Sequence, residues 1–395
     1  MKQLSILGST GSIGRQCLSV VEALPGRFAV AALAAGSNLD ELVGQIERHS
    51  PSLVSVADAA GADALSSRLK EKGIKRPEIH HGPEGMLAAG THPAADIVVS
   101  GAVGVVGLPA TYEAIRLGKQ VALSNKEVLV AAGELVMAAA QKSGRELLPV
   151  DSEHNAIHQC LRAGSRSEVR RLVLTASGGP FRKTPLKALA NVSIEQALAH
   201  PNWRMGRRIT IDSATMMNKG FEVIEARWLF GMRPDQIEVV IHPQSTIHSM
   251  VEYSDGSVLA QLGPTDMRMP IQYALTYPER VASNQVALDW SRLKRLDFQK
   301  VSTRRFPCLR LAREAMRKGG ALPCALNAAD EVAVEAFLGG RLPFSGIAEV
   351  IERVLGRTPR VRFEKMDDVL SADTEARRMA REEVDRMSVA AAAAR

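Results

Sequence analysis

Two acids, two histidines and a cysteine stand close together in the stretch PVDSEHNAIHQC. Asp151 and Glu153 offer hard oxygen ligands, which suit Mg²⁺ or Mn²⁺. His154, His158 and Cys160 offer softer ligands, which suit zinc. The histidines are four residues apart and can share a helical face, but no HExxH signature is present. We therefore expect helix packing or solvent around these three residues, and a hard-metal site that needs a third acid.

A second polar stretch, HPNWRMGRRITIDSATMMNKGFEVIEARWLFG, begins at His200. Its first part holds a proline and a closing glycine, which predicts a loop that can close over a ligand. Ser213, Asn218 and Lys219 follow as suitable donors for a phosphate. Glu222 then supplies a carboxylate that can join the two earlier acids around a divalent cation.

A shorter donor loop, ASGGPF, places Ser177 before two glycines, whose backbone can approach an anion. Each of these pieces also has a purely structural reading. Ser213 can cap a helix, and Glu222 can lie on a solvated face. Their occurrence in one chain that also carries a nucleotide-binding turn favours the functional reading.

The turn GSTGSIG follows a strand-like run and precedes a helix-like one, which is the context of a dinucleotide-binding turn. Gly8 allows the tight turn, Gly11 lets the backbone approach a pyrophosphate, and Gly14 permits close packing of helix on strand. The residues from Thr10 to Ile13 then present backbone donors at a helix N-terminus. The alternative is a plain glycine-rich turn.

The end of the second strand-like run indicates which dinucleotide binds. An NAD site usually carries an acid there, which bonds the ribose hydroxyls. This chain has Gly36, Ser37 and Asn38 instead, so no carboxylate repels a 2′-phosphate and NADP is favoured. Ser37 or Asn38 can also cap the next helix, and both roles are compatible.

These motifs need elements to position them, and the sequence predicts an α/β protein in three parts. Residues 1–150 alternate β-like and helix-like runs, which indicates a Rossmann-like parallel sheet that binds NADPH. Residues 151–280 indicate an α+β domain that carries the metal and substrate motifs, with a hairpin turn at Ser254-Asp255-Gly256; its roles in catalysis and dimerisation are what the family resemblance described below implies. Residues 281–302 form an irregular linker, and 303–395 form a helical domain.

Composition narrows the class of partner. The four cysteines are scattered, without a CxxC pair, as in reduced cytoplasmic proteins. The formal charge of +7 is spread along the chain and aromatic residues make up only 4%, so nucleic acid is not expected. We expect no membrane span and no secretory signal. Anionic small molecules are the favoured partners.

The motifs GSTGSIG, AAGSN, SNKE, DSEHNAI, TASGGPF, HPNWRMG, DSATMMNKGFEVIEARWLF and HPQSTIHSMVEY together resemble the 1-deoxy-D-xylulose 5-phosphate reductoisomerase family. The resemblance implies a homodimer that uses NADPH and Mg²⁺ or Mn²⁺, with Co²⁺ as a further option. It implies conversion of 1-deoxy-D-xylulose 5-phosphate to 2-C-methyl-D-erythritol 4-phosphate, a precursor of isoprenoids. Some members carry a basic residue where this chain has Ser37.

The resemblance also implies a role for each matching residue. The metal ligands are Asp151, Glu153 and Glu222. The substrate contacts are Lys126, Ser152, Glu153 and Glu222 at the reacting end, and Ser177, His200, Ser213, Asn218 and Lys219 at the phosphate end. The candidate catalytic residues are Lys126, Glu153 and His200. The NADPH contacts are Thr10, Gly11, Ser12, Ile13, Gly36, Ser37, Asn38, Asn125, Glu127 and Gly206.

Two other functions fit the sequence less well. An NADP-dependent semialdehyde dehydrogenase shares a glycine-rich opening but needs a nucleophilic cysteine in a polar loop, whereas Cys160 lies in a helix-like context. A catalytically silent nucleotide-binding protein needs neither the acids nor the phosphate donors. The joint presence of both groups argues against it.

Overall fold

The computed structural model describes residues 1–203, 205–282, 287–291 and 293–393. Parts of the predicted linker (283–286 and 292) and the last two residues of the chain lie outside the described residues. The chain divides into two compact units, each described here by itself. The first comprises Met1–Val128, Val136–Asn155 and Asp266–Ala287, and the second comprises Leu129–Leu135, Ala156–Thr265 and Leu288–Arg395.

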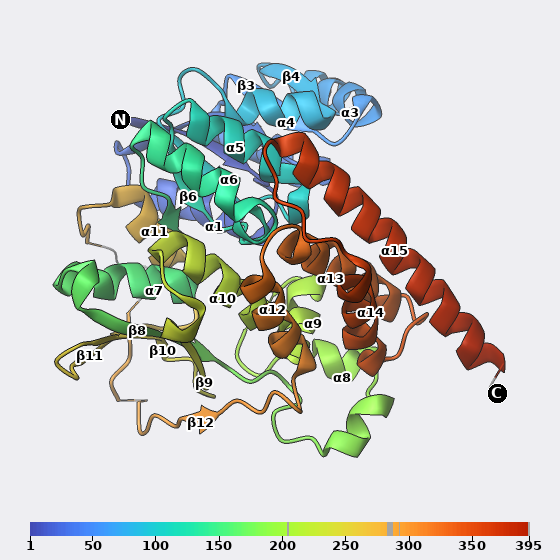
Figure 1. Ribbon diagram of the computed structural model, residues 1–395. Helices are drawn as coiled ribbons and strands as arrows, with labels where there is room; N and C mark the ends of the chain where they lie inside the picture. The colour runs from blue at the N-terminus through green and yellow to red at the C-terminus, as the bar shows by residue number, and fades with distance from the viewer. Residues whose placement is uncertain (204, 283–286, 292, 394–395) are drawn as a thin grey trace. The chain divides into compact units, whose positions relative to one another are not determined.

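The first unit is built on a parallel sheet with strand order β4-β3-β2-β1-β5-β6-β7 (Figure 1). Its strands are β1 (Lys2–Leu7), β2 (Phe28–Ala34), β3 (Leu53–Val56), β4 (Glu78–His81), β5 (Ile97–Ser100), β6 (Gln120–Leu123) and β7 (Leu148–Pro149). The order reverses between β1 and β5, and such a switch point is where α/β sheets bind ligands. The predicted parallel sheet is confirmed, while β4, an exposed edge strand without an apolar run, was not predicted.

Helices cover this sheet and complete its core. They are α1 (Ser12–Ala23), α2 (Leu39–His49), α3 (Ala59–Glu71), α4 (Gly82–Gly90), α5 (Leu108–Arg116) and α11 (Arg268–Thr276). Two further helices are divided between the units: α6 (Glu127–Ser143) lies in the first unit except for Leu129–Leu135, and α7 (Ser152–Cys160) begins in the first unit and ends in the second. The central strands β3, β5 and β6 are buried on both faces along nearly their whole length, as expected of a sheet covered on both sides. The helix α11 belongs to the first unit although it lies in the segment predicted as the middle domain. The division of the sequence into three domains stays a prediction.

The second unit contains a mixed sheet with strand order β11-β10-β8-β9-β12. Its strands are β8 (Val169–Ala176), β9 (Ile237–Ile241), β10 (Ile247–Tyr253), β11 (Val258–Leu262) and β12 (Gln299–Lys300). β8 and β9 are parallel, and the other pairs are antiparallel. The predicted hairpin turn joins β10 to β11, with Gly256 at φ +87°. The short β12 lies within the segment predicted as an irregular linker.

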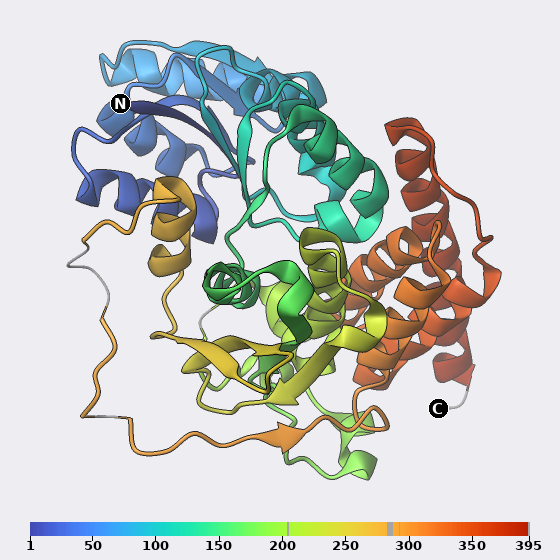
Figure 2. The ribbon, with the colours of Figure 1, turned by 60° about the vertical axis from the view of Figure 1, so that its left-hand side comes forward.

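The remaining helices of the second unit include the predicted C-terminal helical part, drawn in orange to red in Figure 2. They are α8 (Ile194–Leu198), α9 (Arg207–Thr215), α10 (Met217–Phe230), α12 (Pro307–Lys318), α13 (Leu322–Leu338), α14 (Phe344–Arg357) and α15 (Met366–Ala393). Short 3₁₀ turns occur at Gly104–Gly107, Leu161–Ala163, Arg166–Glu168, Leu186–Asn191 and Pro234–Gln236. α13 is buried along most of its length and packs against both α14 and α15.

Candidate active site

The glycine-rich turn between β1 and α1 has the close packing that the sequence predicts. Gly8 has φ +86°, which favours glycine, and a Cβ added there would lie 2.7 Å from the carbonyl oxygen of Gly101. A Cβ on Gly14 would lie 2.3 Å from the carbonyl oxygen of Ser9. Gly11 precedes α1 without a side-chain cap, and both Gly11 and Ser12 are exposed. The amides at the start of α1 therefore face a surface where an anion can bind.

The second predicted nucleotide segment lies at the carboxyl end of β2. Gly36, Ser37 and Asn38 are all exposed. The Asn38 side chain accepts a hydrogen bond from the backbone N–H of Glu41 at 3.3 Å and so caps α2. The capping role is thereby confirmed, and the segment carries no carboxylate that would repel a 2′-phosphate.

Asn125 follows β6 and supports the loop after β5. Its Nδ2 donates to the carbonyl oxygens of Ala102 and Gly104, the latter at 2.7 Å, and its Oδ1 accepts from the backbone N–H of Glu127 at 3.1 Å. The side chain thus holds in place the loop at the switch point. Gly206 precedes α9 and belongs to the second unit, whereas the other predicted NADPH contacts belong to the first.

The first unit also gathers the residues predicted for the reacting end of the substrate. Lys126 follows β6 and Asp151 follows the neighbouring β7, so the sheet brings them to the same edge. Lys126 Nζ donates to Asp151 Oδ2. Ser152 Oγ donates to Glu153 Oε2 at 2.5 Å, and its backbone N–H donates to Asp151 Oδ1 at 3.1 Å. A lysine, a hydroxyl and two carboxylates therefore form one cluster.

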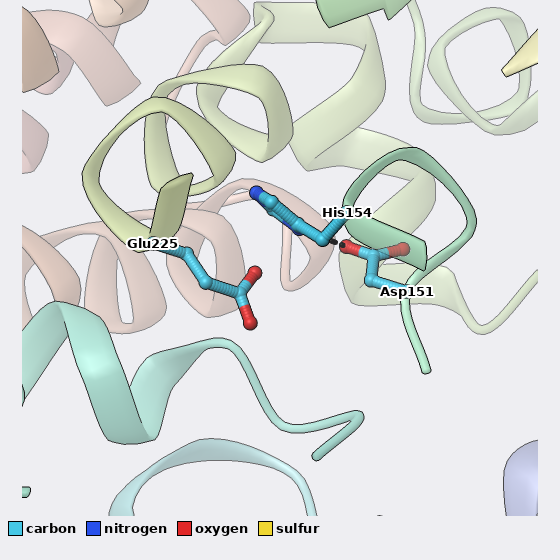
Figure 3. Close-up of side chains that lie close together, drawn as sticks. All are labelled: Asp151, His154 and Glu225. Carbon is cyan, nitrogen blue, oxygen red and sulfur yellow. Dashed lines mark ion pairs between the residues drawn. The ribbon is translucent and has the colours of Figure 1, made fainter. Parts of the chain in front are cut away.

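His154 lies next to this cluster but was expected to pack in the helix. Its Nδ1 is 3.9 Å from Asp151 Oδ2, and Figure 3 draws this pair as a dashed line. His154, His158 and Cys160 are all buried in α7, as the packing interpretation predicted. Burial also raises the pKa of the Cys17 thiol to about 12, and it raises the pKa of Cys308 and Cys324. None of these three thiols suits nucleophilic catalysis.

In the second unit, Ser177 and His200 come together after β8. His200 Nε2 lies 3.0 Å from Ser177 Oγ, while His200 Nδ1 accepts from the backbone N–H groups of Asn202 at 3.2 Å and Trp203 at 2.9 Å. Because Nδ1 accepts twice, the proton of the neutral ring resides on Nε2. Burial lowers the pKa of His200, which favours this neutral form.

The two glycines after Ser177 bring this loop to α9. Gly178 has φ +81° and Gly179 has φ +64°. A Cβ on Gly179 would lie 2.7 Å from the carbonyl oxygen of Ser213, so only glycine allows this close approach. Ser213 lies inside α9, which rules out the helix-cap reading for this residue. Ser177 and Ser213 are thereby brought to neighbouring positions.

Helix α10 carries the remaining predicted residues of the second unit. Met216, at φ +64°, ends α9 and starts α10. Asn218 Nδ2 donates to Glu222 Oε1 at 2.6 Å, and Lys219 Nζ donates to Glu222 Oε2. Glu222 is fully buried, which excludes the solvated-face reading. Glu222 and the pair Asp151 and Glu153 belong to different units.

Sequence reasoning missed two polar residues of the second unit. Asn202 Nδ2 donates to the carbonyl oxygen of Pro243 at 2.6 Å and to Ser245 Oγ at 3.0 Å, which fastens the predicted closing loop. Glu225, labelled in Figure 3, is fully buried on α10. Its spacing of three residues from Glu222 places both acids on one helical face, a signal that the sequence does contain.

Comparison with known proteins identifies the family. The family model "1-deoxy-D-xylulose 5-phosphate reductoisomerase" matches residues 4–133, and its C-terminal domain model matches 147–230. The model "DXP reductoisomerase C-terminal domain" matches 262–379. A 1-deoxy-D-xylulose 5-phosphate reductoisomerase of Solibacter usitatus is 53% identical over 97% of this chain and 97% of its own length. The chain belongs to this family.

Solved structures of the reductoisomerase family share the whole fold. One, described as DOX-P reductoisomerase in complex with NADPH, fosmidomycin and magnesium, is 39% identical with a TM-score of 0.91, covering 98% of this chain and 99% of that chain. The Zymomonas mobilis reductoisomerase in complex with NADPH is 42% identical with a TM-score of 0.90, covering 97% of this chain and 99% of that chain.

Among the described helices, none is long and apolar enough to cross a membrane.

Proposed function

We propose that this chain converts 1-deoxy-D-xylulose 5-phosphate to 2-C-methyl-D-erythritol 4-phosphate, with NADPH as reductant and a divalent cation as cofactor. The observation that carries the proposal is the cluster of Lys126, Asp151, Ser152 and Glu153 at the carboxyl ends of β6 and β7, in a chain that matches reductoisomerases over nearly its full length. The relatives' NADPH and magnesium complexes support the choice of cofactors.

NADPH binding is assigned to the first predicted domain, residues 1–150. Backbone donors from Thr10 to Ile13 bind the pyrophosphate, and the segment from Gly36 to Asn38 accepts the 2′-phosphate without repulsion from a carboxylate. Asn125 and Glu127 lie beside the switch point, and Gly206 contributes from the start of α9. The middle and C-terminal parts, 151–280 and 303–395, supply the substrate pocket and its helical support.

The metal ligands are assigned to Asp151, Glu153 and Glu222. Their oxygens are the ligands that Mg²⁺ and Mn²⁺ prefer, and Co²⁺ accepts the same set. The charges of two of these residues fit a cation as well. Lys126 bonds Asp151 and Lys219 bonds Glu222, so each acid has a negative charge that a positive partner balances, and a divalent cation would balance it in the same way. When bound, the cation supplies Lewis-acid polarisation of the substrate's oxygens.

The other residues bind and orient the substrate. At the reacting end, Lys126 and Ser152 donate to substrate oxygens, and Lys126 or Glu153 holds the proton that moves during the rearrangement. At the phosphate end, the donors are Ser177, Ser213, Asn218 and Lys219, with His200 donating from Nε2. Phosphate contacts lie away from the reacting carbons, so their binding energy serves to close the loop and orient the substrate.

The assembly is proposed to be a cytoplasmic homodimer. The edge strand β11 supports this, because Val258 and Leu259 are exposed on it and an unpaired strand edge is a ready interface. Sedimentation velocity should give twice the chain mass, and a monomer mass at assay concentration would exclude the dimer. Besides its second subunit, the chain is proposed to bind a phosphorylated sugar as substrate and to bind neither nucleic acid nor a membrane.

The catalytic proposal is tested by following NADPH absorbance with the purified full chain. We expect oxidation only when 1-deoxy-D-xylulose 5-phosphate and Mg²⁺ or Mn²⁺ are both present. Xylulose 5-phosphate, which keeps the phosphate but adds a hydroxyl at the methyl end, serves as the matched control substrate. No oxidation by folded protein loaded with the metal would refute the proposal.

A further inference from the structure

A buried group of charged side chains joins α9 to α13, away from the residues proposed to bind metal. Asp330 of α13 is fully buried, and neither of its carboxylate oxygens meets a hydrogen-bond donor among the described residues. An ionised carboxylate in that position would be strongly disfavoured, because burial without donors costs several kcal/mol. The surroundings of Asp330 therefore decide in which form it is buried.

The nearest cation, Arg208 of α9, bonds mainly to other partners. Its Nη1 is 3.1 Å from Glu331 Oε1, and its Nη2 donates to Asn327 Oδ1 at 3.3 Å. Its Nη2 lies 4.0 Å from Asp330 Oδ2, and its Nε lies 3.8 Å from Asp212 Oδ2. One guanidinium thus serves three carboxylates, and Asp330 has the longest of these contacts.

Among the described residues, the ion pairs of the other elements packed against α13 bring no further cation to Asp330. On α15, Arg377 bonds Glu331 at 2.7 Å and Asp373 at 2.6 Å. On α12, Arg310 pairs with Glu314 and with Glu352 of α14, while the Cys308 thiol lies near Asp330. The remaining charged residues of α14 with described ion pairs, Glu349, Arg353 and Arg357, bond one another or α15.

A second buried acid, Asp212, shares the guanidinium of Arg208 with Asp330, at 3.8 Å and 4.0 Å respectively. Burial raises the pKa of Asp330 well above its usual range, and the negative charge of Asp212 raises it further. Arg208 acts in the opposite direction but only partly offsets these two effects. Two buried carboxyl groups that share one guanidinium cannot both ionise without a large cost in free energy, so a single proton between them is the favoured arrangement.

We propose that Asp330 and Asp212 share one proton and, with Arg208, fix α9 on α13 so that Ser213 is held in the phosphate pocket. Asp330 is then a positioning residue, since it acts through α9 and not on the substrate. α9 begins directly after Gly206 of the closing loop and carries Ser213 one residue after Asp212. The effect on the substrate rests on the proposed function, whereas the shared proton does not.

The shared proton makes stability depend on pH in a defined direction. A carboxyl whose folded pKa is raised binds a proton in the folded chain that the unfolded chain has already released. The stability it contributes is present below the unfolded pKa and is lost as pH rises toward the folded pKa. Above pH 5, the unfolding constant of the wild type should therefore rise about tenfold per pH unit relative to a variant that lacks this proton.

The test is chemical denaturation of the full chain at about pH 5.5 and about pH 8.5, comparing wild type with Asp330→Asn. Asparagine keeps a neutral hydrogen-bond donor of the same shape, so the variant should gain stability relative to wild type as pH rises. Asp373→Asn is the matched control, because Asp373 is paired with Arg377 and its loss should destabilise without this trend. If Asp330→Asn does not fold, Asp212→Asn should show the same relative gain.

A stability difference between wild type and Asp330→Asn that stays constant over this range, or a loss like that of Asp373→Asn, would overturn the shared proton. The positioning role of Asp330 is tested by a separate experiment, the measurement of steady-state kinetics. Asp330→Ala should raise the KM for the phosphorylated substrate several-fold and raise the KM for NADPH less, because only Gly206 at the start of α9 is a proposed NADPH contact, and Asp330→Asn should restore both values. Equal effects on both KM values would refute positioning. A chain without reductase activity would still report on the shared proton through denaturation.

Discussion

Replacing Gly14 by alanine tests whether NADPH binding depends on the close contact between α1 and the glycine-rich turn. The added Cβ would lie 2.3 Å from the carbonyl oxygen of Ser9, 2.4 Å from Ser9 Cα and 2.5 Å from the carbonyl oxygen of Gly8. All three neighbours are backbone atoms, so no flexible side chain can move aside. The helix itself must shift away from the turn.

The size of the shift sets the expected effect. Ordinary contact with a Cβ begins at 3.4 Å, so the backbone must separate by about 1 Å. Such overpacking costs about 1–3 kcal/mol of folding free energy. The same shift moves the amides at Ser12 and Ile13 by about 1 Å from the pyrophosphate, and a misplacement of that size can cost roughly a hundredfold in rate. We expect the KM for NADPH to rise at least tenfold, about 1.4 kcal/mol of lost binding.

The assay is NADPH titration at saturating sugar phosphate and metal, together with chemical denaturation. Gly44→Ala is the control, because Gly44 lies within α2 and a Cβ there meets nothing within 4 Å. That variant should keep its KM and gain about 0.5–1 kcal/mol, since alanine favours helix over glycine. A Gly14→Ala enzyme with the KM and stability of the wild type would show that the turn does not bind the dinucleotide through close packing.

Two further predictions concern the metal and pH. Glu222→Gln removes a metal ligand but keeps an oxygen for Lys219, so the metal concentration for half-maximal activity should rise at least tenfold while the fold persists; unchanged metal activation would exclude Glu222 as a ligand. Because the folded pKa of His200 is lowered, stability of the His200 turn is present above its unfolded pKa and lost as pH falls below it. The KM for the sugar phosphate should stay constant while His200 is neutral and rise once the pH falls below its lowered folded pKa. A KM that stays constant through the pH at which His200 becomes protonated, followed by NMR, would contradict this role.

The sequence predicts the parts of the fold that follow a regular pattern. The buried parallel strands are continuous apolar runs, and the β10–β11 turn has a Ser-Asp-Gly signal, so both were predicted. β4 and β12 escaped prediction because each is short and exposed at a sheet edge, where pairing with one neighbour replaces the apolar pattern. α11 could not be assigned to the first unit, because its packing on α1 is a contact between distant segments.

In the candidate site, too, features with a fixed spacing in the sequence were predictable and contacts between distant residues were not. Motifs with fixed spacing, such as Gly8, Gly11 and Gly14, carry their geometry in the sequence, and the structure gives Gly8 and Gly14 the predicted close contacts. The shared-proton pair was not predictable, because Asp212 and Asp330 lie more than a hundred residues apart and a carboxyl group gives no sign of its protonation in a sequence. The burial of both residues, which the structure supplies, supports the proposal that one of them is neutral.

In each unit a lysine pairs with one of the acids that are proposed to bind the metal. In the first, Lys126 neutralises Asp151, and in the second, Lys219 neutralises Glu222. A buried carboxylate without such a partner would destabilise its unit by several kcal/mol, so each unit can fold with its acid in place before any cation binds. Both lysines are also proposed substrate contacts. The positive charge that stabilises each acid during folding is therefore also proposed to bind the substrate's oxygens. This double use explains why Lys126 occurs with Asp151 and Lys219 with Glu222.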